Sequence, residues 1–314
     1  MLGGTGTIGR ATVRALVARG HETVCLVRRA PDPPGLPEGA VVRVADVTDP
    51  VSLARDGLRG ERFDVLVSCL ASRTGLPADA WAIDYGAQAN ALQASRAAGV
   101  GHAVLLSAIC VQKPVLAFQH AKLAFEAELM ASGLDYTIVR PTAFFKSLSG
   151  QVERVRRGKP FLVFGDGRLT ACKPIGDADL GAYLADCLDR ADQRNRVLPI
   201  GGPGGAITPR AQGEHLFALL GRAPRFTHVP VALLDVIVAG LEFLGRWWPA
   251  LAAKAELARI GRYYATESML VLDPATGRYD AQATPSTGSQ TLFDHYARLI
   301  RGEVTAERGD HAVF

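Results

Sequence analysis

Cysteine is scarce in this sequence, and none stands in a spacing that binds metals or forms redox pairs. The 314 residues hold five cysteines and no Cys-x-x-Cys pair. Three of them, Cys25, Cys69 and Cys110, lie in apolar runs typical of strands, where cysteine behaves as a small hydrophobic residue. We therefore expect a reducing compartment, no disulfide and no metal site.

Long hydrophobic runs and strong charge are also missing. No uncharged apolar stretch reaches the roughly 18 residues of a membrane-spanning helix, and no signal peptide is visible. The net charge of +4 at pH 7 is small and spread along the chain, which excludes the dense basic surface that binds nucleic acid. With 48% hydrophobic and 21% charged residues, the composition predicts a globular, cytoplasmic protein with a sizeable core.

Glycine, by contrast, is concentrated at the start of the chain. A Gly-x-Gly-x-x-Gly frame runs from Gly4 to Gly9, and apolar residues at helical spacing follow it to about Arg19. This pattern predicts a tight turn that opens a helix, where free backbone N–H groups and the helix dipole receive a pyrophosphate. The residues expected to form this cofactor-binding turn are Gly3, Gly4, Thr5, Gly6, Thr7, Ile8 and Gly9.

Two arginines stand where such a fold reads the ribose of its dinucleotide. A strand-like run ends in Arg28 and Arg29, about 20 residues after the glycines. Enzymes specific for NAD usually carry an acidic residue there, whereas a cationic fork can pair the 2′-phosphate of NADPH. The sequence therefore predicts NADPH as the cofactor. Asp46, at the end of the next strand, has two interpretations: contact with the adenine, or a cap for the helix at 50–58.

The first half of the chain alternates short apolar runs with helical patterns. This alternation predicts an α/β fold with a Rossmann-type, doubly wound parallel sheet. We expect an NADP-binding domain over 1–145 and a smaller C-terminal substrate lobe over 146–314, with 177–200 packing back on the sheet. Strands are expected at 22–28, 41–45, 63–69, 102–109 and 135–140, and helices at 7–19, 50–58, 80–98 and 116–132.

Most of the first strand of such a sheet is missing from the sequence. The fold places that strand immediately before the glycine turn, in the middle of the sheet, yet only Met1 and Leu2 precede Gly3. We expect a gap or a very short strand between the strands at 22–28 and 63–69. We also expect the natural protein to begin upstream, because a central strand buried on both faces is a longer apolar run.

A strongly apolar helix is expected at 230–246. Its polar residues Asp235, Glu242 and Arg246 share one narrow stripe that contains no lysine. This favours a helix packed in the interior over one that lies on a membrane surface. Trp247 and Trp248 follow it, either as core-filling residues or as walls of an apolar binding slot.

A tyrosine is absent from the position where short-chain dehydrogenases carry one. Ser107 stands near the end of the strand expected at 102–109, and Phe118-x-x-x-Lys122 follows on the next helix. In short-chain dehydrogenases a serine and a Tyr-x-x-x-Lys motif occupy these places, where the lysine binds the nicotinamide ribose and the tyrosine protonates a carbonyl oxygen. Phe118 therefore argues against carbonyl reduction. We expect Ser107 and Lys122 to bind the cofactor, with Lys122 as the catalytic residue.

Longer runs carry a more specific signal than these motifs. They are residues 106–114, 118–126, 136–147, 165–167, 171–175, 199–203 and 260–269. They resemble the NADPH-dependent divinyl chlorophyllide 8-vinyl reductases of plants and phototrophic bacteria, an atypical, NmrA-like branch of the short-chain dehydrogenases. The resemblance extends from Gly3 to about Arg301, and the family's phenylalanine matches Phe118.

The resemblance implies reduction of the 8-vinyl group of divinyl chlorophyllide or protochlorophyllide to ethyl, in chlorophyll or bacteriochlorophyll biosynthesis. It implies NADPH and the tetrapyrrole as partners, with peripheral contact to a photosynthetic membrane. The alternative is a non-catalytic, NADP-binding redox sensor of the same branch, which the loss of the tyrosine alone would also fit. The substrate-side candidates are Arg140 and Lys146 for the propionate, Phe144 and Phe145 as walls, and Cys172, Lys173, Tyr263 or Tyr264 as proton donor.

Overall fold

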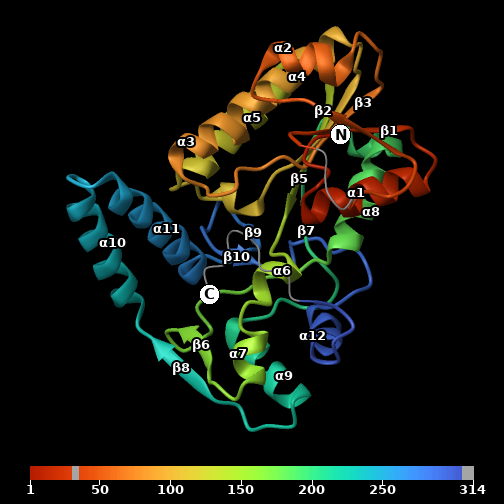
Figure 1. Cartoon of the computed structure of the whole chain (residues 1–314). Coiled ribbons are helices and arrows are strands. Elements are labelled where there is room, and N and C mark those ends of the chain that lie inside the picture. The colour runs from red at the N-terminus through yellow and green to blue at the C-terminus, as the bar shows by residue number, and fades with distance from the viewer. Residues whose placement is uncertain (30–34, 306–314) are drawn as a thin grey trace. The chain divides into compact units, whose positions relative to one another are not determined.

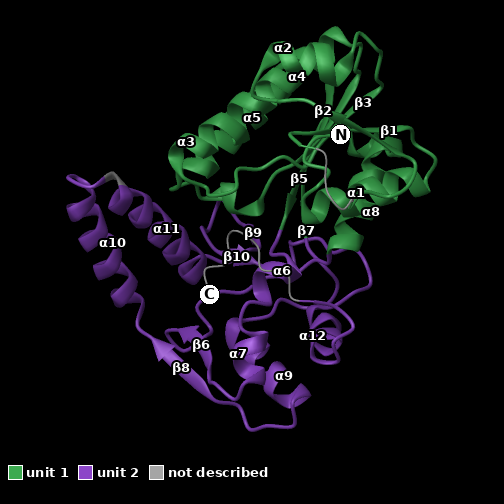
Figure 2. Cartoon of the chain, viewed as in Figure 1, with its two compact units in different colours: residues 1–141, 177–200 green, residues 142–176, 201–314 purple. Residues whose placement is uncertain are grey.

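The computed structural model describes residues 1–29 and 35–305, which form two compact units (Figures 1 and 2). Unit 1 comprises Met1–Pro141 and Asp177–Ile200, and unit 2 comprises Thr142–Gly176 and Gly201–Phe314. The chain thus leaves unit 1, returns to it for a helix and a strand, and leaves it again. Over the described ranges, no helix is both long enough and apolar enough to cross a membrane.

Unit 1 is built on a parallel sheet. Four strands pair in the order β3-β4-β5-β7, and β1 pairs with β2, every pair being parallel. Parallel neighbours need crossover connections, so the alternation in the sequence becomes a sheet with helices on both faces, and the predicted α/β fold is confirmed. The strands are β1 (Thr23–Val27), β2 (Ala40–Val44), β3 (Val65–Ser68), β4 (His102–Leu106), β5 (Asp135–Pro141) and β7 (Arg196–Ile200).

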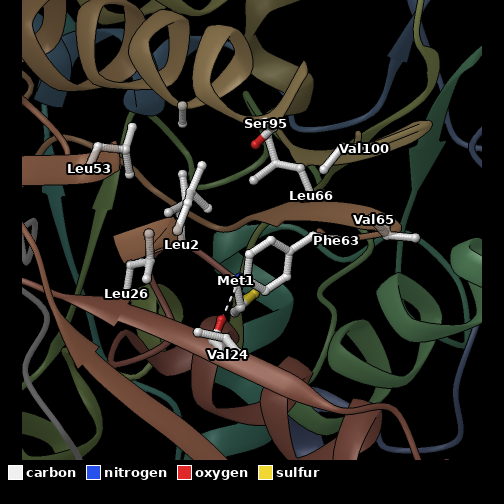
Figure 3. Close-up of a pocket in the computed structure, with 12 residues that line it drawn as sticks. Met1, Leu2, Val24, Leu26, Leu53, Phe63, Val65, Leu66, Ser95 and Val100 are labelled. Atoms are coloured by element: carbon white, nitrogen blue, oxygen red, sulfur yellow. Dashed lines mark hydrogen bonds between the residues drawn. The ribbon is translucent and has the colours of Figure 1, made fainter. Parts of the chain in front are cut away.

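Met1 and Leu2 link β1 to β3 in the middle of this sheet. The Met1 carbonyl accepts from the Leu26 N–H at 3.0 Å, and the Met1 ammonium donates to the Val24 carbonyl at 2.8 Å. Leu2 is the bridging residue. It forms one bridge to Leu26 and one to Ser68. Its N–H donates to the Val67 carbonyl at 2.9 Å, and its carbonyl accepts from the N–H of Cys69 at 3.0 Å. The expected very short strand is therefore present. A small apolar cavity lies beside it (Figure 3), lined by Met1, Leu2, Val24, Leu26, Leu53, Leu58, Phe63, Val65, Leu66, Ala91, Ser95 and Val100.

Helices cover both faces of the unit 1 sheet (Figure 1). Two of them, α1 and α8, pack closely: a Cβ atom on Gly181 of α8 would lie 2.6 Å from the Ala11 carbonyl carbon of α1, so this crossing requires glycine. The helices are α1 (Thr7–Ala18), α2 (Pro50–Ser52), α3 (Pro77–Ala80), α4 (Gln88–Ala97), α5 (Ala117–Ala131) and α8 (Asp177–Asp189), with π-helices η1 (Leu53–Leu58) and η2 (Trp81–Ala87) and 3-10 turns η3 (Ile109–Gln112) and η4 (Ala191–Gln193).

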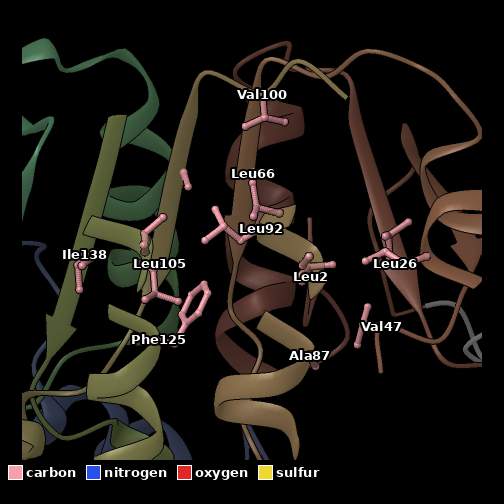
Figure 4. Close-up of a cluster of buried hydrophobic side chains, with 14 residues drawn as sticks. Leu2, Leu26, Val47, Leu66, Ala87, Leu92, Val100, Leu105, Phe125 and Ile138 are labelled. Carbon is pink, nitrogen blue, oxygen red and sulfur yellow. The ribbon is translucent and has the colours of Figure 1, made fainter. Parts of the chain in front are cut away.

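The core of unit 1 lies between the sheet and the helices of one face (Figure 4). Leu66, Leu105 and Ile138 project from β3, β4 and β5, and they meet Leu92 of α4 and Phe125 of α5. These side chains lie at most 9% exposed. Burial of one such side chain contributes about 1.5–3 kcal/mol, so this layer fixes α5, which carries the predicted catalytic lysine, against the sheet.

Unit 2 has a core of its own. Strands β6 (Phe161–Phe164) and β8 (Phe226–Val229) pair in parallel, and β9 (Val271–Leu272) and β10 (Tyr279–Asp280) pair antiparallel. The helices are α6 (Phe145–Leu148), α7 (Val152–Arg156), α9 (Pro209–Leu219), α10 (Val231–Gly245), α11 (Pro249–Thr266) and α12 (Leu292–Ile300). Side chains from α6, α7, β6, α9 and α12 form the core, including Phe145, Val155, Phe161, Phe217 and Tyr296.

The helix α10 differs from the prediction. It occupies the expected residues, but none of its 15 residues is buried, so the expectation of a helix packed in the interior is wrong. Trp247 and Trp248 are 61% and 56% exposed, so they do not fill the core either. The error lies in the direction of the polar stripe: Asp235 pairs with Arg262 of α11, so the stripe faces the neighbouring helix and the apolar side faces outward.

Candidate active site

The glycine turn has the geometry that a pyrophosphate site needs. Gly3 has a φ of +67°, and the Gly6 N–H donates to its carbonyl at 3.1 Å. A Cβ atom on Gly9 would lie 2.0 Å from the same carbonyl oxygen, so a side chain there would force the turn open. Within the described residues 1–29, α1 begins without a side-chain cap and without an acidic residue in its first turn. Its N-terminal dipole is therefore available to an anion.

The other residues of the predicted turn support it in different ways. Thr5 and Gly6 are exposed, whereas Gly4 and Ile8 are buried. Ile8, at 7% exposed, packs in the core, so its part in cofactor binding would be through the backbone. Thr7 is the first residue of α1. The turn thus combines an exposed rim with a buried base, as a phosphate cradle requires.

Arg28 and Arg29 follow β1 directly, and both are exposed. Asp46 follows β2, and its carboxylate accepts hydrogen bonds from the Thr48 hydroxyl at 2.6 Å and from the Thr48 N–H at 2.9 Å. These bonds, with a smaller effect from Arg28, lower the pKa of Asp46. The helix at 50–58 is capped by Asp49, which accepts from the Val51 N–H at 2.9 Å, so the capping interpretation of Asp46 is wrong.

Lys122 is held by a buried carboxylate. Its Nζ lies 2.8 Å from Asp84 Oδ1, and the Asp84 side chain is fully buried while that of Lys122 is 13% exposed. The same Oδ1 accepts from the Ser72 N–H at 3.3 Å, and the buried Oδ2 has no hydrogen-bond partner among the described residues. Asp84 lies in the π-helix η2, a type of distortion that is frequent at functional sites. The pair fixes the ammonium at the N-terminal half of α5.

A second buried carboxylate, Glu126, joins Ser107 and Arg140. Glu126 is one turn beyond Lys122 on α5 and 1% exposed. It accepts from the Ser107 hydroxyl, and Arg140 Nε and a terminal guanidinium nitrogen donate to its two oxygens, the Nε bond at 3.2 Å. This network ties α5 to the ends of β4 and β5. It also occupies the guanidinium nitrogens of Arg140 that a substrate propionate would otherwise bind.

Comparison with known proteins identifies the family to which a chain with this site belongs. A family model described as NAD(P)H-binding matches residues 3–191, which contain the glycine turn, both arginines and Lys122. The chloroplastic divinyl chlorophyllide a 8-vinyl-reductase of Cucumis sativus is 50% identical over 330 residues, covering 100% of this chain and 79% of that protein. The enzyme of the same name from Zea mays is 48% identical over 327 residues, covering 99% and 82%.

The chain belongs to the divinyl chlorophyllide a 8-vinyl-reductase family. The predicted nicotinamide cofactor is confirmed by the NAD(P)H-binding match. Among solved structures, the NADPH-dependent quinone oxidoreductase QOR2 from Escherichia coli, complexed with NADPH, has a TM-score of 0.69 at 19% identity, covering 95% of this chain and 98% of that one. At this identity the likeness shows the fold alone.

Seven of the substrate-side candidates of this 8-vinyl-reductase family member lie in unit 2. Phe145 is 3% exposed in the core of that unit, where its ring lies 5.3 Å from the ring of His295, so it supports the core and does not line an open wall. Phe144 is half-buried and is the N-cap residue of the short helix α6, of which Lys146 is the second residue. Tyr264 is 42% exposed.

The other candidate proton donors of the reductase are less accessible. Cys172 is buried, and this burial raises the pKa of its thiol to about 12. Lys173 Nζ donates to the Thr284 carbonyl at 2.7 Å and to the Ser286 hydroxyl at 3.3 Å. Tyr263 is 4% exposed. These surroundings make Cys172 a weak acid near neutral pH and assign Lys173 to a structural contact.

Sequence reasoning missed two residues of this site, Asp84 and Glu126. Asp84 stands in an apolar stretch of the helix expected at 80–98, and Glu126 stands at helical spacing from Lys122. An acidic residue on the apolar face of a predicted helix is the signal that could have found Asp84, because a buried charge is almost always paired. Nothing local in the sequence identifies the partners, which lie 38 and 14 residues away.

Proposed function

We propose that this protein uses NADPH to reduce the 8-vinyl group of divinyl chlorophyllide or divinyl protochlorophyllide to ethyl. One observation carries the proposal: the cofactor-positioning Lys122 is retained and anchored by Asp84, while Phe118 replaces the proton-donating tyrosine one turn earlier on α5. A site of this kind can place a nicotinamide but cannot protonate an oxyanion beside it. A carbon–carbon double bond is the substrate that suits this combination.

The turn at Gly3–Gly9 and the N-terminus of α1 fit the pyrophosphate, and Arg28 with Arg29 fit the 2′-phosphate. When bound, NADPH supplies a hydride to the terminal vinyl carbon. The negative charge that results is delocalised into the macrocycle, so no acid is needed at Phe118, and a proton that originates from solvent adds to the inner carbon to complete the ethyl group. Lys122 holds the nicotinamide ribose, and Asp84 keeps the ammonium in place.

Substrate binding is assigned to residues outside the cofactor-binding turn and the two arginines. We infer that Lys146, half-buried and two residues from the half-buried Phe144, contacts the propionate. The Arg140 fork is engaged by Glu126. Phe144 is the aromatic candidate for contact with the macrocycle, since Phe145 is buried. The proposed setting is the cytoplasm at the periphery of a photosynthetic membrane, because the apolar products of the tetrapyrrole pathway are used there.

The test compares the two divinyl substrates side by side. Purified protein is mixed with NADPH and either divinyl chlorophyllide or divinyl protochlorophyllide, and both NADPH oxidation and the 8-ethyl product are followed. We expect NADPH loss that matches product formation for at least one substrate. A non-catalytic redox sensor, the alternative, would bind NADPH and leave it reduced with both substrates, and that result would replace the proposal.

A further inference from the structure

The hairpin of α10 and α11 in unit 2 is amphipathic with its polar side turned inward. The two helices pack along each other (Figure 1). Close to their connection, a Cβ atom on Gly245 would lie 2.9 Å from the Ala252 Cα. Asp235 and Glu242, on one stripe of α10, pair with Arg262 and Arg259 of α11. The carboxylates of α10 are thus paired with arginines of α11, and these four side chains stay 44–50% exposed.

The opposite side of α10 is apolar and exposed. We call it the outer face; it consists of Leu233, Val236, Ile237, Phe243 and Leu244, spaced three, four and seven residues apart. Val236 and Phe243 are 69% and 56% exposed. Residues at this spacing form one continuous stripe along a helix. A stripe of this size exposed to water is costly, and large exposed apolar patches mark interaction sites.

Aromatic and basic residues gather where the hairpin turns. Trp247 and Trp248 follow α10 directly, and Arg246 lies over the ring of Phe243, 5.9 Å from its centroid. Lys254 is exposed on the first turns of α11. Tryptophan prefers the boundary between apolar and polar layers of a bilayer, and arginine and lysine are attracted to anionic headgroups.

We propose that the outer face of α10, with Trp247 and Trp248, lies in the headgroup boundary of a bilayer that contains anionic lipid. A helix of 15 residues is about 22 Å long, which is shorter than the roughly 30 Å hydrocarbon core, so it rests in the plane of the surface and does not span it. Arg262 pairs with Asp235, and Arg259 pairs with both Glu242 at 3.7 Å and Glu256 at 3.3 Å, so little negative charge of the hairpin opposes an anionic surface.

A matched pair of exposed valines distinguishes binding through the outer face from binding through any exposed apolar residue. Val236 of the outer face and Val51 of α2 in unit 1 are 69% and 66% exposed, and both stand on helices. The experiment is vesicle flotation of three proteins: the unmodified parent, Val236→Glu and Val51→Glu. Each is mixed with vesicles of phosphatidylcholine alone and with vesicles of equal parts phosphatidylcholine and phosphatidylglycerol. Thermal unfolding of each variant reports whether its fold is intact, which we expect because both positions are exposed.

We expect the parent and Val51→Glu to float with the phosphatidylglycerol vesicles. Val236→Glu should bind them at least about tenfold more weakly, a loss of about 1.4 kcal/mol of binding free energy. Arg246→Glu with Lys254→Glu should remove the preference for phosphatidylglycerol. A Trp81→Phe background isolates Trp247 and Trp248, whose fluorescence should shift to shorter wavelength on those vesicles.

Three results would overturn the proposal. The parent protein could fail to float with either vesicle, or Val236→Glu could float as well as Val51→Glu. The parent could also be a dimer that Val236→Glu converts to a monomer without any vesicle binding, which would make the outer face a contact between two copies. None of these measurements uses the tetrapyrrole or turnover, so they stand apart from the test of vinyl reduction.

Discussion

Removal of Lys122 should have two separable effects, one on stability and one on turnover. The substitution Lys122→Met keeps the length of the apolar stem and deletes the ammonium. It leaves the Asp84 carboxylate fully buried with no cation 2.8 Å away. Loss of one partner from a buried ion pair costs about 3–5 kcal/mol, because the remaining charge is neither solvated nor neutralised. That is a large part of a typical unfolding free energy of about 5–15 kcal/mol.

The double variant separates the two effects. Asp84→Asn removes the buried charge, so Asp84→Asn with Lys122→Met should recover most of the lost unfolding free energy, because the remaining amide is polar but neutral. Turnover should not recover, since no group is left to hold the nicotinamide ribose. Urea unfolding followed by circular dichroism measures the first effect, and NADPH oxidation with divinyl substrate measures the second.

The outcome is decisive in both directions. Recovery of turnover together with stability in the double variant would show that Lys122 serves only as the counter-ion of Asp84. An unchanged urea midpoint in Lys122→Met would show that Asp84 is not a buried charge paired with Lys122. Either result would refute the claim that the buried Asp84 holds Lys122 in position for catalysis.

Three further variants test the cofactor site. Arg28→Ala with Arg29→Ala should raise the KM for NADPH roughly 10- to 150-fold, the value of one bidentate contact of about 1.5–3 kcal/mol, and leave NADH kinetics unchanged; equal use of both cofactors by the parent would contradict this. Phe118→Tyr should give no faster vinyl reduction, and a large gain would reveal a missing acid. Gly9→Ala should abolish NADPH binding measured by fluorescence, since its Cβ meets a backbone oxygen at 2.0 Å, whereas Gly101→Ala, with open space around it, should bind normally.

The glycine turn and the position of the two arginines were predictable because their signals are local. The glycine turn needs backbone conformations that glycine adopts at little cost, as the φ of +67° at Gly3 shows, and the motif places it at a helix start. Arg28 and Arg29 follow β1 directly, so their place at the edge of the sheet follows from strand order. Lys122 follows Phe118 by one helical turn.

The parts that failed depend on tertiary partners. Arg140 has the chemistry of a propionate ligand, and only the fold reveals that Glu126 engages it. The polar stripe of α10 was recognised, but the side that it faces is set by the arginines of α11, such as Arg262. Periodicity describes which residues share a face of a helix and does not say whether that face meets solvent or a neighbour.

The most direct test of vinyl reduction is a single turnover with NADPH that carries two deuterium atoms at its hydride-donating carbon, so that deuterium is transferred from either face. The protein, divinyl chlorophyllide and one equivalent of the labelled cofactor are mixed, and the product is analysed by mass spectrometry and NMR. We predict one deuterium on the terminal carbon of the new ethyl group and an ordinary hydrogen from solvent on the inner carbon. Bound but unoxidised NADPH with unchanged divinyl substrate, or an ethyl group free of deuterium, would contradict the account.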